Sequence, residues 1–410
     1  MSRERKVPRR RFREFQNGEA WKQIKIGEAG SFYYGHSCPK WSVTEDATIP
    51  CIRYGELYTK FGTKIDRVFS YTNISPNKLR FSKGTEVLIP RVGEDPMDYN
   101  HCTWLSMPGV AIGEMISVYN TEQNPLFTAT MFNATLQEEF AVRVEGGSVT
   151  NLYFEKLKNI DVCFPSIAEQ EKIAGFIEKI DNIINLNQHK LKKLKALKKA
   201  YLTQMFPSVG ESKPKLRFAG FDDEWEQRKL DTITDVRDGT HDSPNYYENG
   251  YPFITSKNVK DGHISYDDIQ YISYEDYEEI NKRSKVEKND ILMGMIGTIG
   301  NLALVRSEPN FAIKNVALIK DIQQINYLYL YHYLYSSNIE QLLLNGMDGG
   351  TQKFFALNKI RELNIVFPLN EEQSKIGDYF ECIDKLINLN RRKLQKLQNL
   401  KKAYLNEMFI

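Results

Sequence analysis

The chain has 410 residues, of which 41% are hydrophobic and 26% charged, and its formal net charge is +2. This length exceeds the usual size of one domain, so we expect at least two hydrophobic cores. The near-neutral charge does not by itself indicate a nucleic-acid-binding protein. Five cysteines without any CxxC spacing favour free thiols in a reducing compartment over a disulfide framework.

The N-terminal segment is basic and lacks a targeting signature. Its first fifteen residues carry seven Lys or Arg and two Glu, without an apolar run. This composition is unlike a signal peptide, and the chain has no run of the ~18 apolar residues that a membrane helix needs. We therefore expect a cytoplasmic protein that makes no membrane contact. The segment could meet DNA phosphates, or it could be a solvated end of the chain.

Residues 1–163 are expected to form a first mixed, β-rich domain. Runs of β-branched and aromatic residues, broken by Gly, Pro and Asn, predict its strands. These runs lie within residues 49–58, 86–93 and 109–119.

Two short motifs in this region resemble a methyltransferase loop and a zinc site, but neither fits the established pattern. Asn124–Phe127 reads NPLF, which resembles a loop of amino-methyltransferases but lacks the second proline, and we interpret it as a turn. His36 with Cys38 and His101 with Cys102 fit no standard zinc spacing. The sequence therefore predicts no metal site.

A long helical segment occurs twice. Residues 164–206 recur as residues 367–409, 203 positions later and without a gap, with about 25 of 43 residues identical. In the first copy the apolar residues follow alternating steps of four and three, the spacing of a heptad seam. These are Ile173, Ile177, Ile180, Ile184, Leu191, Leu194, Tyr201 and Met205. The repeat predicts two long helices, at residues 164–206 and 367–410.

Both copies carry helix-start patterns. Pro165 and Ser166, with Glu169 three positions after the serine, predict a capping box for the first helix. Asn370 with Gln373 can do the same for the second helix.

Chain connectivity favours antiparallel helices. The intervening residues leave the first helix at Phe206 and re-enter the second near Asn370, and only antiparallel helices bring these points together. Asn187 and Asn390 would then face each other near the centre of a coiled coil, where a buried pair would set its register. The alternative is that both are exposed polar positions.

After a linker at residues 207–215, residues 216–366 are expected to form a second β-rich domain. Its predicted strands lie within residues 251–259, 290–300 and 315–322, and a helix is predicted at residues 327–344. The two domains share few sequence anchors, although about 25 of 43 residues are identical in their helical segments.

The duplication extends to the segment that leads into each domain. Both segments have one proline and three aromatic residues at similar spacing. They are Pro8, Phe12, Phe15 and Trp21 in the first, and Pro214, Phe218, Phe221 and Trp225 in the second. This predicts a circular arrangement, in which the second segment follows the first helix as the N-terminus meets the end of the second helix.

Patterns typical of catalysis are missing from the sequence. There is no GxxxxGK[ST], HExxH or GxSxG motif and no convincing nuclease carboxylate cluster. The glycine-rich run Gly294–Asn301 is interpreted as a strand and turn. We therefore expect an α+β protein with a pseudo-twofold internal repeat, no catalytic residues and no enzymatic activity of its own.

The combination of features resembles one family. Two unlike domains are each followed by a helix reading EQxKI, ID, INLN, KL, KKAYL and MF in order. Arg237–His241 reads RDGTH, and Leu216–Leu230 reads LRFAGFDDEWEQRKL. Over essentially its whole length the chain is similar to the DNA-specificity subunit of type I restriction-modification systems.

The resemblance implies a function in a larger complex. Each target-recognition domain would read one half of a split, asymmetric site in double-stranded DNA, and the antiparallel helices would set the spacer. Two modification subunits, which use S-adenosylmethionine, and two restriction subunits, which use ATP and Mg²⁺, would be partners; this chain would hold no cofactor. The alternative is a coiled-coil adaptor with two protein-binding heads.

Candidate DNA contacts are residues whose side chains can donate to base edges or phosphates. In the first domain they are Tyr34, His36, Arg53, Tyr54, Lys60, Arg91 and the turn at Gly146–Thr150. In the second they are Arg237, Thr240, His241, Lys257, Asn258, Lys314, Asn315, Gln352 and Lys353.

The charge pattern complicates this expectation. Residues 222–290 contain eighteen acidic residues and nine Lys or Arg, so a DNA-binding second domain must segregate its charges. Gln188–Lys199 contains six Lys and no acid. This run is either a solvated coiled-coil flank or a contact for partners or DNA.

Overall fold

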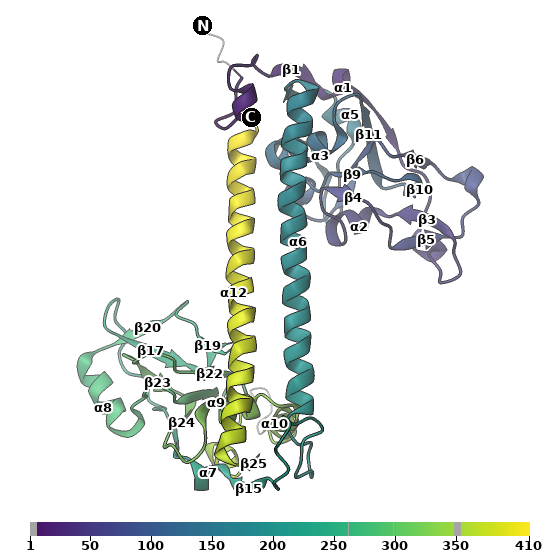
Figure 1. The fold of residues 1–410 in the computed structure, drawn as a ribbon. Coiled ribbons are helices and arrows are strands. Elements are labelled where there is room, and N and C mark those ends of the chain that lie inside the picture. The colour runs from purple at the N-terminus through teal and green to yellow at the C-terminus, as the bar shows by residue number, and fades with distance from the viewer. Residues whose placement is uncertain (1–5, 261, 298, 348–353) are drawn as a thin grey trace. The chain divides into compact units, whose positions relative to one another are not determined.

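The computed structural model describes residues 6–260, 262–297, 299–347 and 354–410 and contains two compact units. One unit comprises the chain up to Asn187 with Lys393–Ile410, and the other comprises Gln188–Arg392. Two continuous helices, α6 (Ile167–Gln204) and α12 (Asn370–Met408), contribute to both units (Figure 1). The α+β class with two β-rich modules and two long helices is confirmed. The domain boundaries stay a prediction.

Helices α6 and α12 run antiparallel, as predicted. In the first unit Lys401 Nζ lies 2.6 Å from a carboxylate oxygen of Asp181. In the second unit Lys198 Nζ lies 2.6 Å from a carboxylate oxygen of Asp384. Each pair joins the first half of one helix to the second half of the other, which parallel helices could not do. The two pairs occupy equivalent positions in the repeat.

The apolar stripe of α6 is covered by two different cores. Its first half is buried in the core of the first unit through Ile173, Ile177, Ile180 and Ile184. Its second half packs against the core of the second unit through Leu191, Leu194 and Tyr201. Each fully buried aliphatic side chain contributes about 1.5–3 kcal/mol to folding.

Among the helices that the structure describes, none is long and apolar enough to cross a membrane.

The first predicted capping box is only half formed, and the second is wrong. Ser166 Oγ accepts the N–H of Glu169 at 3.4 Å, but the Glu169 carboxylate bonds to the Arg11 guanidinium at 2.6 and 2.8 Å. At the start of α12, the side chain of Gln373 accepts the N–H of Asn326 at 2.8 Å. Tertiary partners distant in sequence take the side chains that would complete each box.

The first module is built on two main sheets, with strand orders β2-β11-β7-β9-β4 and β5-β3-β10-β6. The strands of the first sheet are β2 (Gly30–Tyr34), β4 (Lys64–Ile65), β7 (Glu86–Pro90), β9 (Thr103–Leu105) and β11 (Ile116–Thr121). Those of the second are β3 (Ile49–Ile52), β5 (Ser70–Thr72), β6 (Phe81–Lys83) and β10 (Pro108–Ile112).

Smaller sheets and short helices complete the module. A three-stranded sheet has the order β12-β13-β8, and β1 pairs with β14. These strands are β1 (Lys22–Lys25), β8 (Val92–Gly93), β12 (Glu145–Gly146), β13 (Thr150–Asn151) and β14 (Asp161–Phe164). The helices are α1 (Ile26–Ala29), α2 (Tyr54–Thr59), α3 (Pro125–Thr135), α4 (Gln137–Ala141) and α5 (Phe154–Leu157).

Two expectations for the first module need correction. Residues 49–58 form a strand only as far as Ile52, after which α2 begins. The NPLF segment is not a turn but the start of α3: Asn124 caps this helix by accepting the N–H of Phe127 at 2.9 Å. Proline at the first helical position suits this role, because its missing N–H needs no partner there.

The second module has sheets of order β16-β24-β21-β22 and β20-β17-β23, with β18 paired to β19 and β15 to β25. Its strands are β15 (Glu226–Lys229), β16 (Val236–Asp238), β17 (Tyr251–Thr255), β18 (Val259–Lys260), β19 (His263–Ile264), β20 (Gln270–Ile272), β21 (Ile291–Gly294), β22 (Leu302–Leu304), β23 (Ala312–Lys314), β24 (Val316–Ile319) and β25 (Asn364–Phe367). Its helices are α7 (Leu230–Ile233), α8 (Tyr274–Ser284), α9 (Tyr327–Leu334), α10 (Ser337–Asn345) and α11 (Leu357–Arg361). The helix predicted at residues 327–344 is thus two helices.

The lead-in segments repeat their contacts, which confirms the circular arrangement. The N–H of Arg10 donates to the Glu407 carbonyl at 2.8 Å, near the end of α12. The N–H of Leu216 donates to the Gln204 carbonyl at 2.9 Å, at the end of α6. Strand β1 pairs with β14 as β15 pairs with β25, both antiparallel. Each lead-in therefore enters its module beside the end of a long helix.

Candidate nucleic-acid interface

The RDGTH sequence of the second module crosses the edge of a neighbouring strand. A Cβ atom on Gly239 would lie 2.3 Å from the Ile313 carbonyl oxygen, so only glycine fits at this position. The Thr240 N–H donates to that carbonyl at 3.1 Å, and the Asn315 N–H donates to the Thr240 carbonyl at 3.2 Å. These bonds hold the loop after β16 against the connection between β23 and β24.

Side chains from three elements meet at this loop. His241 Nε2 lies 3.0 Å from Asp238 Oδ2, and His241 Nδ1 lies 2.7 Å from Asn315 Oδ1. Arg283, from the end of α8, donates to the other Asp238 oxygen. We call this group, with Thr240 and Lys314, the RDGTH cluster. The structure therefore brings together four predicted contact residues: Thr240, His241, Lys314 and Asn315.

A hollow of about 330 Å³ adjoins the RDGTH cluster and carries both charges. Its lining includes Thr240, Ser243, Asp276, Glu279 and Arg283. In α8 the first turn is acidic and the last turn is basic, but further acids, including Glu279, lie between them. The expected segregation of acidic from basic residues is therefore only partial, because acidic residues still border the hollow.

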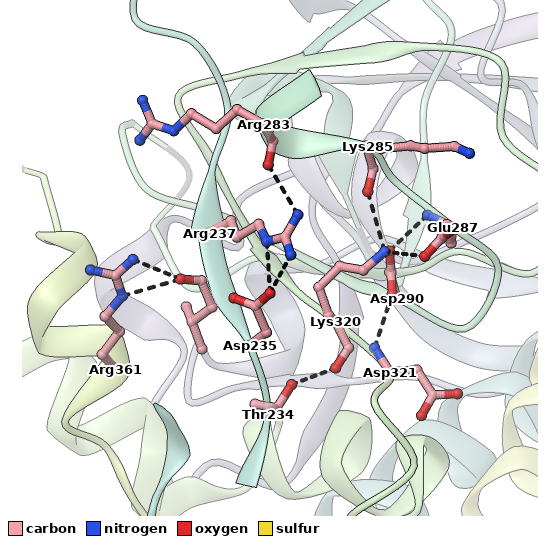
Figure 2. Close-up of polar contacts among 11 residues, drawn as sticks. Thr234, Asp235, Arg237, Arg283, Lys285, Glu287, Asp290, Lys320, Asp321 and Arg361 are labelled. Carbon is pink, nitrogen blue, oxygen red and sulfur yellow. Dashed lines mark hydrogen bonds and ion pairs between the residues drawn. The ribbon is translucent and has the colours of Figure 1, made fainter. Parts of the chain in front are cut away.

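The Arg237 side chain forms hydrogen bonds with other residues of the second module. Its Nε donates to Asp235 Oδ2 at 2.7 Å and its Nη1 to the Arg283 carbonyl at 3.2 Å (Figure 2). The hydrogen bond to the Asp235 carboxylate raises the pKa of Arg237, so its charge is held in place. These contacts use much of the hydrogen-bonding capacity of the Arg237 guanidinium. A role for Arg237 in DNA contact stays a prediction.

A buried ion pair supports the same region. Lys320 is 9% exposed and Asp290 1%, and their charged atoms are 2.7 Å apart. Lys320 also contacts Glu287 at 2.6 Å (Figure 2). The bond from Lys320 lowers the pKa of Glu287, whereas burial raises the pKa of Asp290. The network links β24 to the turn before β21 and thereby braces the sheet that carries Arg237.

The remaining candidates of the second module differ in accessibility. Asn258 is buried, and its Oδ1 accepts the N–H of Thr255 at 3.0 Å while its Nδ2 donates to the Ser265 carbonyl at 3.1 Å. Its amide stabilises a turn, whereas neighbouring Lys257 is exposed. Gln352 and Lys353 lie outside the described residues.

In the first module, arginines and tyrosines gather around β2. The Arg91 guanidinium lies 4.9 Å from the centre of the Tyr34 ring, and Tyr34 Oη donates to Glu155 at 3.0 Å. Burial, and then the bond to Glu155, raise the pKa of Tyr34 to about 12, so the hydroxyl stays a donor. Arg80 donates to the Tyr34 carbonyl at 2.8 Å and was missed by sequence reasoning, because the two residues are 46 positions apart.

The first module has a hollow beside a strained loop. Its lining includes Cys38, Lys40, Arg53, Tyr54 and Glu114. Ser37 and Cys38, which follow the exposed His36, both have φ of 64°, a conformation that non-glycine residues seldom adopt. Arg53 and Tyr54 thus share a surface. Trp41, 71% exposed, lies in the same loop and escaped sequence reasoning.

Other predicted residues have local partners. Lys60 lies 2.8 Å from Glu56 on α2 and remains partly exposed. Gly146–Thr150 forms the connection between β12 and β13, as expected of a turn. Asn187 and Asn390 are 8% and 6% exposed. Their role in setting helix register stays a prediction. Within the described ranges, no group of three or more His, Cys, Asp or Glu is placed to hold a metal ion.

Comparison with known proteins gives consistent matches. A model of the type I restriction modification DNA specificity domain matches residues 111–196 and 222–399. The chain is 23% identical over 287 residues to the MjaVIII type I restriction enzyme specificity subunit of Methanocaldococcus jannaschii, covering 67% of each chain. It is 22% identical over 344 residues to the EcoBI type I restriction enzyme specificity subunit of Escherichia coli, covering 76% of this chain and 71% of that relative.

The fold has a solved counterpart. The structure is similar to the S subunit of a type I restriction-modification system from M. genitalium, with a TM-score of 0.66 and 15% sequence identity. The match covers 98% of this chain and 99% of that one. The resemblance in fold thus extends over both modules and both long helices.

Proposed function

Because this chain belongs to the type I restriction-modification DNA specificity family, we propose that it is the subunit through which such a complex recognises a two-part DNA sequence. Each module reads one half of an asymmetric site in double-stranded DNA. The antiparallel helices hold the halves at a fixed spacing. Chemistry on the DNA belongs to partner subunits, and this chain contributes recognition alone.

One observation supports this proposal: the framework is repeated while the modules' exposed clusters are not. Arg11 bonds to Glu169 in one unit as Arg217 bonds to Glu372 in the other. By contrast, the second module exposes the RDGTH cluster, and the first exposes the different surface around Arg53. One scaffold that presents two unlike surfaces suits a reader of two unlike half-sites.

Docking of two identical partners is supported by exposed apolar residues on the long helices. Three exposed apolar residues on α6 have exposed apolar counterparts 203 positions later on α12. The pairs are Ile183 (42%) and Leu386 (43%), Leu186 (69%) and Leu389 (62%), and Leu197 (42%) and Leu400 (45%). Repeated apolar patches suit two copies of one partner.

These partners are two modification subunits that bind S-adenosylmethionine, joined for restriction by two translocating nuclease subunits that use ATP and Mg²⁺. Flipping and methylating the target base is the work of the modification subunits. This chain needs no cofactor of its own.

Methylome sequencing tests the proposal. A host expressing this chain with its cognate modification subunit is compared with a host that expresses the modification subunit alone. We expect a new N6-methyladenine motif in two parts around a fixed, unspecified gap. If the complex assembles and no such motif appears, the adaptor with two protein-binding heads is the better account.

A further inference from the structure

The side chain of Asn315 is presented from a fixed backbone. Asn315 is the single residue between β23 and β24, and its φ of 52° lies in the left-handed region. Its N–H donates to the Thr240 carbonyl at 3.2 Å, and its carbonyl accepts the hydroxyl of Ser256. Both backbone polar groups are therefore engaged, and the amide has little freedom beyond rotation about its own side-chain bonds.

The hydrogen bonds of His241 depend on its proton. Its two ring nitrogens face Asp238 Oδ2 at 3.0 Å and Asn315 Oδ1 at 2.7 Å, which are both acceptors. An imidazolium can donate to both, because both of its nitrogens carry hydrogen. A neutral ring that donates Nε2–H to Asp238 leaves Nδ1 as an acceptor. The Asn315 amide must then turn over and offer its N–H₂ group to the ring.

We propose, on the basis of the DNA-reading function above, that Asn315 determines base preference at one position and that His241 is its positioning residue. With His241 charged, the amide oxygen faces the ring and the N–H₂ group faces outward, where it suits the N7 and O6 acceptors of guanine. With His241 neutral, the oxygen faces outward, where it suits the amino groups of adenine or cytosine.

The charges around His241 come from several elements. Asp238 of β16 is 8% exposed and also accepts from Arg283 of α8. Lys314 of β23 donates to Ser243, and Asp242 follows His241 in the loop. The His241 side chain is 62% exposed, so the ring and the Asn315 amide can contact DNA. The buried Asp238 carboxylate holds the other side of the ring.

The test uses the purified complex of the full chain with its cognate modification subunit. A library of randomised duplex DNA is selected at about pH 6 and about pH 8, which bracket the usual titration of imidazole. In Asn315→Gly, glycine accepts the left-handed backbone and only the amide is lost. We expect a fall of about 5- to 150-fold in discrimination at one base pair of one half-site.

Asn289→Gly is the matched control, because Asn289 lies in the same module with φ of 75°. It should leave discrimination unchanged. Asn315→Asp presents only acceptors and should favour amino-bearing bases at both pH values. His241→Phe keeps a ring without nitrogens and should abolish the change of preference with pH.

The outcomes separate this inference from the proposed function. If the native complex selects no sequence, the proposed function fails and the inference with it. If the native complex selects a two-part site but Asn315→Gly weakens all positions equally, or no more than Asn289→Gly does, the inference alone is wrong. Persistence of the pH effect in His241→Phe would refute the positioning role.

Discussion

Lys198 donates two hydrogen bonds to the carboxylate of Asp384, at 2.6 and 2.8 Å, and the two side chains are only 17% and 15% exposed. The equivalent pair, Lys401 and Asp181, is likewise 2.6 Å apart, with exposures of 24% and 25%. The same ion pair thus joins α6 to α12 once in each unit, which makes each pair an internal control for the other.

Asp384→Asn should destabilise the second unit. It leaves the Lys198 ammonium largely buried without a counter-charge, at a cost of about 2–3 kcal/mol, below the cost for a fully buried pair because some solvent screening remains. Urea unfolding measures this loss. The more exposed Asp181→Asn should cost less, and exchanging the two charges (K198D with D384K) should restore part of the stability. If the charge-exchanged variant is no more stable than Asp384→Asn, the ion pair does not contribute to stability.

Arg217→Met should destabilise the attachment of the second module to α12. Its partner Glu372 is only 1% exposed, and the guanidinium lies 2.7 Å from that carboxylate. An unpaired carboxylate at this depth costs about 3–5 kcal/mol. Thermal unfolding should show a matching loss for Arg11→Met, which unpairs Glu169 in the first unit. Adding Glu372→Gln to Arg217→Met should recover stability, and failure to do so would mean that the arginine acts only through packing.

Glu287→Gln should make the free energy of unfolding depend less on pH under acidic conditions. The bond from Lys320 lowers the pKa of Glu287 from its ordinary value of 4.5, so the unfolded chain holds this proton more tightly than the native protein. The contribution of Glu287 is therefore complete above pH 4.5 and lost as pH falls below it. Burial raises the pKa of Asp290, which acts in the opposite direction.

Chemical unfolding between about pH 3 and pH 7 checks this prediction. Wild-type stability should fall more steeply below pH 4.5 than that of Glu287→Gln. Glu279→Gln, on exposed α8, is a suitable control because its partner Lys282 is also exposed. Equal slopes for wild type and Glu287→Gln would contradict the assignment.

An insertion of four residues between Leu186 and Lys190 of α6 tests the spacer function. The insertion shifts the heptad pattern, so spacer preference should change or disappear while both half-sites remain recognisable. Methylome sequencing of a host carrying this variant measures both properties. An unchanged spacer would exclude the helices as the element that sets it.

Much of the framework was predictable because its information is periodic or repeated. The heptad spacing in residues 164–206 predicts a long helix, and the second copy supplies its partner. The spacing of Pro8, Phe12 and Phe15, repeated at residues 214, 218 and 221, predicts the circular placement of the lead-in segments. These inferences depend on patterns within short windows or on the comparison of two copies, and both are available without a structure.

The exposed clusters were predictable only in part. The RDGTH sequence indicated Thr240 and His241, but Arg283 was not predicted, because it reaches Asp238 from 45 positions away. Likewise, nothing in the local sequence joins Arg80 to Tyr34. Such contacts depend on strand order and helix placement, which set the neighbours of a side chain regardless of their separation along the chain.

The sequence by itself determined the repeat, the two long helices, their antiparallel direction and the family resemblance, because each follows from periodicity, duplication or chain connectivity. Only the tertiary structure decided how individual polar side chains are used. Glu169 has the spacing of a cap yet binds Arg11, which lies 158 positions earlier. A buried carboxylate is stabilised more by a guanidinium than by a backbone N–H, and the fold supplies that guanidinium.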